Sequence, residues 1–573
     1  DKAMAFQVSP GVQVKEIDAT SVVPAVSTSI GGFAGSFNWG PVEQVVSIGS
    51  EKELLATFST PDDNTALYFL TASAFLKYGN ALKVVRAASG HDNATADGSG
   101  LLIKNDDDYT NSGYDGGAGS VGEWAAKFPG DLGNSLKVEM VTADVTTSNY
   151  NAWAFNGQFD GKPGTSDYAI NLGRSASYND EIHVIVIDED GLFTGTANTV
   201  LETFAFMSIG SDAKANDGTS NYYVDVINAG SDYIRWMDHK TTSPTWSAGS
   251  TLKGSTSLAG GFDTVDSKSL SGGTDDNSPT AAELAVAYDL LEDAETVDVN
   301  LLFAVPDANG VNTIANDLIS IANARKDCMA FVSPPIADTQ GSSTPAADVK
   351  AFVDSLTSSS YASCDSTALY VYDKYNDKYR YIGAAGHVAG LCANTDQIAD
   401  AWFSPAGVNR GQLLGVTKLA FNPKQADRDT LYKARANPIV SFPGQGTILF
   451  GDRTLLSKPS AFDRINVRRL FNTLEKAIST AAKAQLFEFN DEFTRAQFKN
   501  LVEPFLRDVK GRRGLSDFLV VCDNTNNTSQ VIDSNQFVAD IFIKPAKSIN
   551  FITLNFVATR SGVEFNEIAG TSA

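Results

Sequence analysis

Histidine and cysteine are the side chains best suited to act as a base and a nucleophile, and the chain has four of each. His387 lies five residues before Cys392, and folding could also bring it to Cys364, so either cysteine could complete a nucleophilic pair. A lone histidine beside glycines is more often structural. No His-Glu-x-x-His or Gly-x-Ser-x-Gly motif occurs, and Gly444-Gln445-Gly446 lacks the remainder of a phosphate-binding loop. The sequence therefore predicts no catalytic site and no enzyme.

Metal and cofactor sites are equally weakly indicated. Asp188-Glu189-Asp190-Gly191 and the stretch from Asp106 to Asp115 supply carboxylates, but neither has the spacing or the closing glutamate of a calcium loop. The cysteines are widely spaced and form no Cys-x-x-Cys pair, which argues against zinc and against a disulfide framework. We therefore expect the acidic loops to be solvated and the cysteines to be reduced, as in a protein made in a cytoplasm. We expect no metal and no cofactor.

Composition narrows the class of protein. The 573 residues are 43% hydrophobic and 20% charged, which predicts a globular chain of several domains. A net charge of −24 argues against nucleic acid as a partner, because phosphate binding needs a basic surface. No apolar run is long enough to cross a bilayer, and Asp1-Lys2-Ala3-Met4 does not resemble the start of a secretory signal. We therefore expect no membrane insertion.

One stretch, from Asp463 to Phe489, is predicted to form a long amphipathic helix. Its apolar positions recur at steps of three and four and predict a buried face: Val467, Leu470, Phe471, Leu474, Ile478, Ala481, Ala482 and Leu486. The opposite side is predicted to carry a basic stripe: Arg468, Asn472, Lys476, Thr480 and Lys483. Residues 452–513 contain 13 basic and 8 acidic residues in an otherwise acidic chain. The stripe is either a solvated face or a contact surface for an acidic partner.

The remaining periodicities predict a mixed α/β (α+β) fold. Helices are expected at 50–58, 64–78, 281–292, 311–325, 346–356, 491–502 and, shorter, 504–511. Strands are expected at 30–34, 82–87, 136–141, 182–187, 222–227, 299–305, 329–332, 369–373, 518–522, 537–544 and 550–559. Alternation of helix and strand in the core predicts a largely parallel sheet covered by helices.

Shifts in composition divide the chain into four segments. Residues 1–24 are expected to be an extended arm that could reach a neighbouring molecule, or an edge strand folded back on its own domain. Residues 25–90 with 278–404 form the predicted core domain, and 91–277 a β-rich region of one or two domains inserted into it. Residues 405–573 are predicted to form a C-terminal α+β domain ending in a second arm.

Several short motifs in a fixed order give the chain a family resemblance. They are Ser9-Pro10-Gly11-Val12-Gln13-Val14-Lys15-Glu16, 35–41, Phe58, 75–86, Gly386-His387-Val388-Ala389-Gly390, 409–414, Gly451-Asp452-Arg453-Thr454-Leu455 and Asn466-Val467-Arg468-Arg469-Leu470. Together they resemble the sheath proteins of contractile phage tails. Lys15 and Glu16 are slightly out of step with the family's opening, and Asp452 replaces a more usual alanine. The resemblance covers 8–90 and 280–560, with 386–390 expected as a turn.

The resemblance implies a structural subunit of a virion, made in the host bacterial cytoplasm. Such subunits stack as rings around an inner tail tube, meet baseplate and tail terminator proteins, and contract to drive the tube through the host envelope during genome ejection. Their terminal arms exchange strands with neighbours. The implied arm and acceptor residues are Val8, Val12, Val14, Ile17, Phe537, Ile541 and Ile543. The implied tube-facing residues are Arg468, Lys476 and Lys483.

Two alternatives remain open at this point. A sheath of a phage-tail-derived injection device, such as a tailocin, would have the same motifs. An acidic, self-assembling surface-layer protein would explain the middle of the chain, which is rich in glycine, serine and asparagine, but it predicts a secretion signal.

Overall fold

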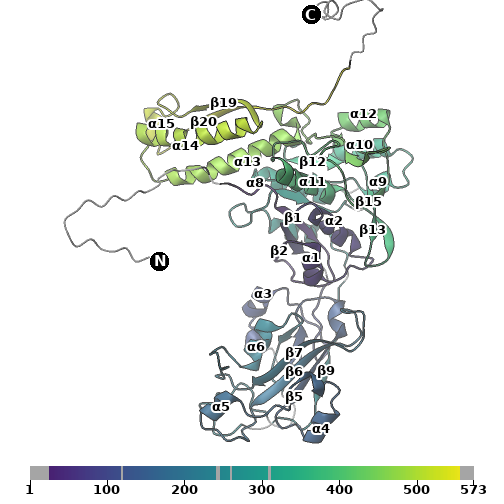
Figure 1. Ribbon diagram of the computed structural model, residues 1–573, viewed down its shortest axis with the longest axis vertical. Helices are drawn as coiled ribbons and strands as arrows, with labels where there is room; N and C mark the ends of the chain where they lie inside the picture. The colour runs from purple at the N-terminus through teal and green to yellow at the C-terminus, as the bar shows by residue number, and fades with distance from the viewer. Residues whose placement is uncertain are drawn as a thin grey trace, which may run out of the picture. The chain divides into compact units, whose positions relative to one another are not determined.

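A computed structural model describes residues 23, 25–88, 90–117, 120–240, 246–258, 261–275, 277–307 and 312–554 (Figure 1). The chain forms two compact units, Asp1–Glu488 and Phe489–Ala573, and each is described by itself. The predicted arm residues Val8, Val12, Val14 and Ile17 lie outside the described residues. The division into four domains therefore stays a prediction.

A seven-stranded sheet forms the centre of the first unit, in the order β16-β12-β11-β10-β1-β3-β2. Every neighbouring pair is parallel except β2 with β3 at one edge. This confirms the predicted fold class. The strands are β16 (Ala436–Asn437), β12 (Ala362–Asp365), β11 (Met329–Val332), β10 (Leu301–Phe303), β1 (Gly31–Gly35), β3 (Leu82–Arg86) and β2 (Val45–Ile48).

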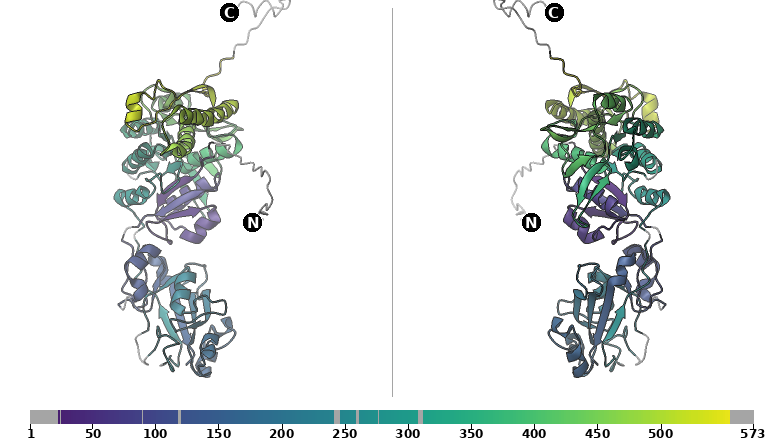
Figure 2. Two further views of the ribbon diagram at one scale, coloured as in Figure 1. Left: turned by 90° about the vertical axis from the view of Figure 1, so that its left-hand side faces the viewer. Right: turned by 90° about the vertical axis from the view of Figure 1, so that its right-hand side faces the viewer.

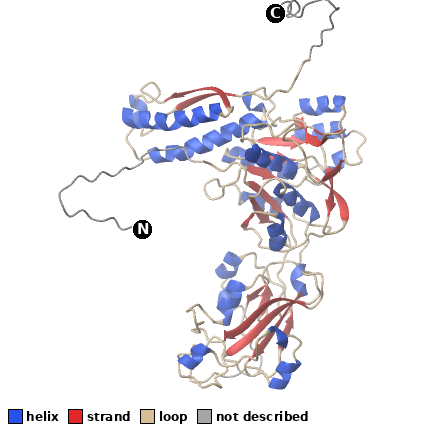
Figure 3. Ribbon diagram, in the orientation of Figure 1, coloured by secondary structure: helices blue, strands red, loops and turns tan. Residues whose placement is uncertain are grey.

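Helices cover both faces of this sheet (Figure 3). Phe33 and Phe331 point to one face, where they pack with α1 (Glu51–Phe58), α2 (Ala66–Leu76) and α11 (Ala385–Ile398). Ala34 and Ala330 point to the other, toward α7 (Ala281–Asp289), α8 (Thr313–Arg325) and α10 (Pro345–Ser355), the teal and green helices stacked along one side in Figure 2. Alternation along each buried strand thus builds two apolar layers.

Two core predictions need correction. Gly386 to Gly390, expected as a turn, lie inside the buried helix α11, because both glycines let it pack tightly on the segment that contains α2. The strand β13 (Leu369–Asp373) has the predicted bounds but belongs to an antiparallel sheet, β14-β13-β15, rather than to the parallel one. The other elements here are β14 (Lys378–Ile382), β15 (Val416–Leu419), α9 (Ile336–Thr339), α12 (Gln425–Lys433), β17 (Ile439–Phe442) and β18 (Gly446–Leu449).

Residues 91–277 contain a four-stranded antiparallel sheet, in the order β7-β6-β5-β9, and a small pair, β4 with β8. The strands are β4 (Trp124–Ala126), β5 (Leu136–Thr142), β6 (Glu181–Asp188), β7 (Thr199–Ser208), β8 (Ile234–Trp236) and β9 (Asp266–Ser269), and the helices are α3 (Asp106–Asn111), α4 (Thr147–Ala152), α5 (Asp167–Asn171) and α6 (Tyr223–Gly230). The strand predicted at 222–227 is wrong: this stretch forms α6, whose Tyr223, Val224 and Ile227 pack into a core cluster with β5 and β6. Asp92 and Thr274, where the region begins and ends, exchange two backbone hydrogen bonds of 3.0 and 3.1 Å.

Helix α13 (Ile465–Ala482) ends the first unit and is shorter than the predicted 463–489. A 3₁₀ turn follows at Lys483–Gln485, and Phe487 has a left-handed φ of 70° that cannot continue an α-helix. Leu486, which the periodicity assigned to the buried face, is therefore 63% exposed.

The second unit packs one helix against a β-hairpin. Helix α14 (Glu492–Gly511) is continuous, whereas two helices separated at Pro504 were predicted; the proline ring lies on the exposed side, where it is accommodated. The hairpin consists of β19 (Leu515–Val521) and β20 (Asp540–Pro545), with α15 (Ser529–Asp533) between them. Residues 550–554 form no strand, and the rest of the strand predicted at 550–559 lies outside the described residues.

Candidate interaction site

Helix α13 buries both apolar and polar side chains. Val467, Leu470, Leu474 and Ala481 are buried, as the periodicity predicts. Arg468, Arg469 and Asn472 are also buried, so the helix has no continuous exposed basic stripe. The site is therefore built from buried cations and the groups that compensate them.

Arg469 holds the chain that leads into β1. Its guanidinium forms an ion pair with Asp396 of α11 at 2.7 Å, and its Nη2 donates to the carbonyl of Thr28 at 3.3 Å. The hydroxyl of Thr28 donates to the same Asp396 carboxylate at 2.7 Å. Burial acts to lower the pKa of Arg469, but Asp396 more than offsets this and the net pKa is raised. The arginine therefore stays charged.

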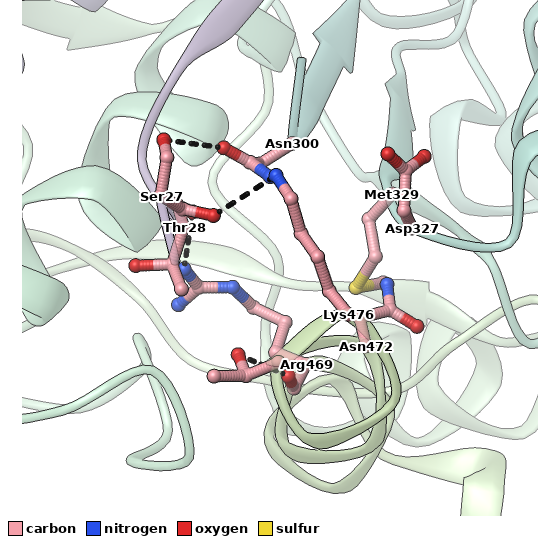
Figure 4. A pocket seen from close by; sticks show the side chains of 9 residues that line it. Ser27, Thr28, Asn300, Asp327, Met329, Arg469, Asn472 and Lys476 are labelled. Atoms are coloured by element: carbon pink, nitrogen blue, oxygen red, sulfur yellow. Dashed lines mark hydrogen bonds between the residues drawn. The ribbon is translucent and has the colours of Figure 1, made fainter. Parts of the chain in front are cut away.

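Lys476 makes a second attachment about two turns further along α13. Its ammonium group forms an ion pair with Asp298 and donates to the carbonyl of Ser27 at 3.3 Å. Asn300 accepts from the Ser27 hydroxyl and from the Ile30 amide, both at 3.2 Å. Figure 4 shows Lys476, Asn300 and Ser27 converging from α13, from the segment before β10 and from the chain before β1.

We call Thr28, Asp396, Arg469, Ser27, Asp298, Asn300 and Lys476 the arm-root clamp. The pocket between them encloses about 20 Å³, room for about one water molecule and not for a larger ligand. The clamp joins residues that lie 73 to 449 positions apart in sequence, and no local pattern signals it. The sequence predicted a long helix in this stretch and an arm ending near residue 24, but no connection between the two.

The three cations predicted to face a tube lie in different surroundings. Arg468 is 4% exposed, its guanidinium carbon lies 4.3 Å from the Tyr361 ring centroid, and its Nε donates to Asn472 at 2.9 Å. The expectation of an exposed Arg468 is wrong, because aromatic rings and an amide offer the guanidinium a buried position. Lys476 is half-buried in the clamp, and Lys483 is exposed just after α13. No observation tests contact with a tube.

The hairpin of the second unit presents the predicted acceptor residues. Ile541 and Ile543 are half-buried, and the Phe537 ring, just before β20, lies 5.5 Å from that of Phe498 on α14. The other face exposes the cross-strand pair Leu519 and Phe542, at 57% and 59%. Among residues 489–554, β19 and β20 have only each other as partners. The extended chain beyond them exposes Ile549, Phe551, Ile552 and Leu554.

The candidate catalytic and metal residues are structural. Burial lowers the pKa of His387 to about 3, and its Nε2 lies 3.2 Å from the Leu414 carbonyl. Burial raises the pKa of Cys392 to about 12 and that of Cys364 well above its usual value, which leaves neither as a thiolate nucleophile. Asp188 accepts from Ser135 and Thr194, and Asp106 pairs with Arg235. No cluster of metal-binding side chains occurs among the described residues.

The described helices include none with the length and apolar character needed to cross a membrane.

Comparison with known proteins decides the family. Models of the phage tail sheath protein central domain and of the phage tail sheath C-terminal domain match residues 280–455 and 457–559, and one of the tail sheath protein Gp18 domain III N-terminal region matches 28–87. The tail sheath protein of Vibrio phage KVP40 is 34% identical over 98% of this chain and 99% of its own length. The chain belongs to the phage tail sheath protein family.

Other sheath proteins are similar to it in sequence or in fold. The tail sheath protein of Enterobacteria phage T4 is 33% identical, again over 98% of this chain and 99% of its own. Among solved structures, the sheath complex of an extracellular contractile injection system (PVC) in its contracted state has a TM-score of 0.51 at 14% identity, covering 97% of this chain and 99% of that one. A sheath tail protein from Listeria innocua has a TM-score of 0.51 at 12% identity, covering 91% and 96%.

The pattern of matches agrees with the resemblance in the motifs. The three sequence models leave residues 88–279 unmatched, whereas the full-length phage sheath proteins align through this region. All relatives described here are sheath proteins. Family membership also removes the support for a surface-layer protein.

Proposed function

We propose that this sheath protein polymerises helically around the inner tube of a contractile phage tail and contracts to drive the tube through the host envelope. The observation that carries the proposal is identity of 33–34% to phage tail sheath proteins along nearly the whole chain. Phage relatives at this identity favour a phage over an injection device, whose sheath is only 14% identical.

Copies are joined, in this proposal, by strands added to the β19–β20 hairpin of a neighbour. The hairpin supports this because its described strands have unpaired outer edges, and edges of this kind readily accept a further strand. Residues 5–17, with Val8, Val12, Val14 and Ile17, supply one donor, and the apolar chain from Ile549 to Leu554 supplies the other. Main-chain hydrogen bonds would hold neighbours together while their bodies move.

We propose that Lys483 and the less exposed Lys476 contact the tube. Arg468, which is buried, is no longer proposed for this contact. Lys483 is exposed and forms no salt bridge among the described residues, so an acidic tube surface could meet it. Contacts between exposed charges are individually weak and can be released on contraction. The baseplate and the tail terminator are the proposed partners at the two ends of the sheath.

Electron microscopy of the full chain and of a chain lacking residues 1–24, across a concentration series, tests the proposal. We expect tubes or stacked rings from the full chain and single particles from the truncated chain. Because the clamp begins at Ser27, the truncation leaves the described contacts of β1 intact, and equal thermal unfolding of the two chains is the control. Tubes from both chains would contradict arm exchange. Single particles from both, even with tube protein added, would contradict polymerisation.

A further inference from the structure

Charge is distributed unevenly along the second unit. Residues 489–554 contain eight acidic and eight basic residues and are therefore neutral overall. The two signs nevertheless collect at opposite ends of α14 and of the hairpin packed on it. A neutral unit with this polarity can attract another copy of itself.

The acidic end consists of Asp491, Glu492, Asp523 and Asp540. Asn524, in the turn after β19, donates to Glu492 at 3.3 Å, and Asn526 in the same turn donates to Asp540 at 3.0 Å, which gathers the carboxylates. All four residues are exposed, and none forms a salt bridge within the described chain. The Thr494 amide lowers the pKa of Asp491 and the Thr525 hydroxyl lowers that of Asp523, so both stay ionised. The buried Arg495 offsets only part of this charge.

The basic end consists of Arg507, Lys510, Arg512, Arg513, Lys544 and Lys547. The Ala546 amide donates to the Gly514 carbonyl at 3.1 Å, which brings the end of β20 beside the end of α14. Two acids lie here: Asp517 pairs with Lys510 and Asp508 with Arg512, each at 3.0 Å. Arg507, Arg513, Lys544 and Lys547 are exposed and form no salt bridge in the described part of the chain. The basic end thus keeps an excess of positive charge.

Helix stabilisation explains only part of this polarity. Acids in the first turn of α14 and cations in its last turn complement the helix dipole. Asp540, Lys544 and Lys547 belong to the hairpin and its continuation, so stabilisation of their own element by a helix dipole does not account for them. The 20 residues of α14 separate the two ends by about 30 Å, so one unit cannot neutralise itself.

We propose that the basic end of one copy docks on the acidic end of the next copy, head to tail. This inference rests on the proposed polymerisation and adds a second contact to arm exchange. Two unlike, complementary patches on one subunit make a heterologous contact, which propagates into rings or helices instead of closing a symmetric pair. Because complementary patches are present on the same unit, a second copy of this chain is the partner that fits both.

Charge reversal and its repair test the docking contact. Arg507→Glu, Arg513→Glu, Lys544→Glu and Lys547→Glu together take the basic end from a net charge of +4 to −4. Glu492→Lys, Asp523→Lys and Asp540→Lys together take the acidic end from −4 to +2. At low salt we expect each set to raise the protein concentration needed for tube formation about tenfold or more. The chain with all seven substitutions has complementary ends again, with the signs exchanged, and should return to within about twofold of the wild type. The charge-matched control for the basic-end set replaces four exposed lysines elsewhere: Lys52→Glu, Lys253→Glu, Lys433→Glu and Lys458→Glu.

Circular dichroism and thermal unfolding establish that each variant folds. If the basic-end variant does not fold, glutamine at the same four positions replaces it and removes the charge without reversing it. Reversals without effect, or a sevenfold variant as defective as the two sets, would overturn head-to-tail docking. A sevenfold variant that no longer binds tube protein would assign the basic end to the tube and overturn the docking proposal. Deletion of residues 1–24 separates the two proposals. If that deletion abolishes tubes while the reversals do not, only the docking proposal fails.

Discussion

Neighbouring residues of α13 show how the same side chain is used in two ways. Arg469 reaches a carboxylate and three backbone carbonyls and fixes the chain before β1, while Arg468 lies against the rings of Tyr361 and Phe462. Both are buried, and both have their charge compensated locally. The helical period assigned Arg468 to solvent because it identifies a face, not the aromatic partners that other segments bring to that face.

Arg468→Glu should destabilise the fold rather than weaken tube binding alone. A carboxylate at this position would be buried against aromatic faces with no cation to pair with, at a cost of about 3–5 kcal/mol in the free energy of unfolding. Lys483→Glu, at an exposed position, should change it by no more than about 0.5 kcal/mol. Chemical denaturation of both variants checks this. A fully stable Arg468→Glu protein that fails only to bind tubes would restore the exposed interpretation.

Asp365 should make stability depend on pH. It is buried at the end of β12, accepts from the Ser333 hydroxyl, and burial raises its pKa to about 7. The folded state therefore keeps a proton that the unfolded state, with an ordinary pKa, has lost. This contribution to the free energy of unfolding is complete below about pH 4 and falls by about 1.4 kcal/mol per unit as the pH rises toward 7.

Asp365→Asn removes that titration and imitates the protonated carboxyl. Denaturation of wild type and variant at pH 5 and pH 8 should show the variant gaining stability relative to the wild type as the pH rises. A stability difference that stays constant between the two pH values would mean that Asp365 is ionised in the folded protein.

At the level of elements, sequence patterns identified the helices and strands that are determined by their own residues. β11 and β13 have the predicted bounds because short apolar runs fit a buried strand. The residues at 222–227 also favour a strand by type, yet form α6, since packing of Tyr223 and Ile227 decides the outcome there. The sheet to which β13 belongs and the clamp on Arg469 depend on contacts distant in sequence, which no local pattern contains.

Gly386→Ala should destabilise the core although alanine favours helices. A Cβ at Gly386 would collide with the carbonyl oxygen of Thr71 in α2, a backbone atom that cannot move alone. We expect a loss of about 1–3 kcal/mol in the free energy of unfolding, measured by denaturation. Ser479→Ala, on the exposed side of α13, is the control and should be neutral or slightly stabilising. Stabilisation by Gly386→Ala would show that the two helices are not in close contact.

In the whole molecule, the acidity is concentrated in residues 91–277. Residues 91–277 contain 27 acidic and 10 basic residues, a net charge of −17 out of −24. The region joins the core through the paired residues Asp92 and Thr274, and the side chain of Trp39 contacts the rings of Phe128 and Phe193 within it. Its removal would take away most of the acidic charge and would also break the Lys104–Glu43 ion pair and the backbone hydrogen bond from Val42 to Lys104.

Replacing residues 93–273 by Asn-Gly should leave a folded core that still assembles. Asp92 and Thr274 form an antiparallel bridge, which a two-residue hairpin turn can close. Trp39→Gln in the same chain avoids exposing the indole. We expect cooperative thermal unfolding and tubes whose formation depends less on salt, because the self-repelling charge is gone. Aggregation of this shortened chain would mean that residues 91–277 are part of the core fold.

The arm-root clamp also has a mechanical consequence. If a neighbour holds the N-terminal arm, a pull on that arm first meets Ser27 and Thr28, whose carbonyls are held by Lys476 and Arg469. The load passes through two cations into α13 and, by way of Asp396 and Asp298, into α11 and the segment before β10. Strand β1, in the interior of the main sheet, is thereby relieved of tension. Under that condition, a neighbour can pull the subunit by its arm without separating β1 from β10 and β3.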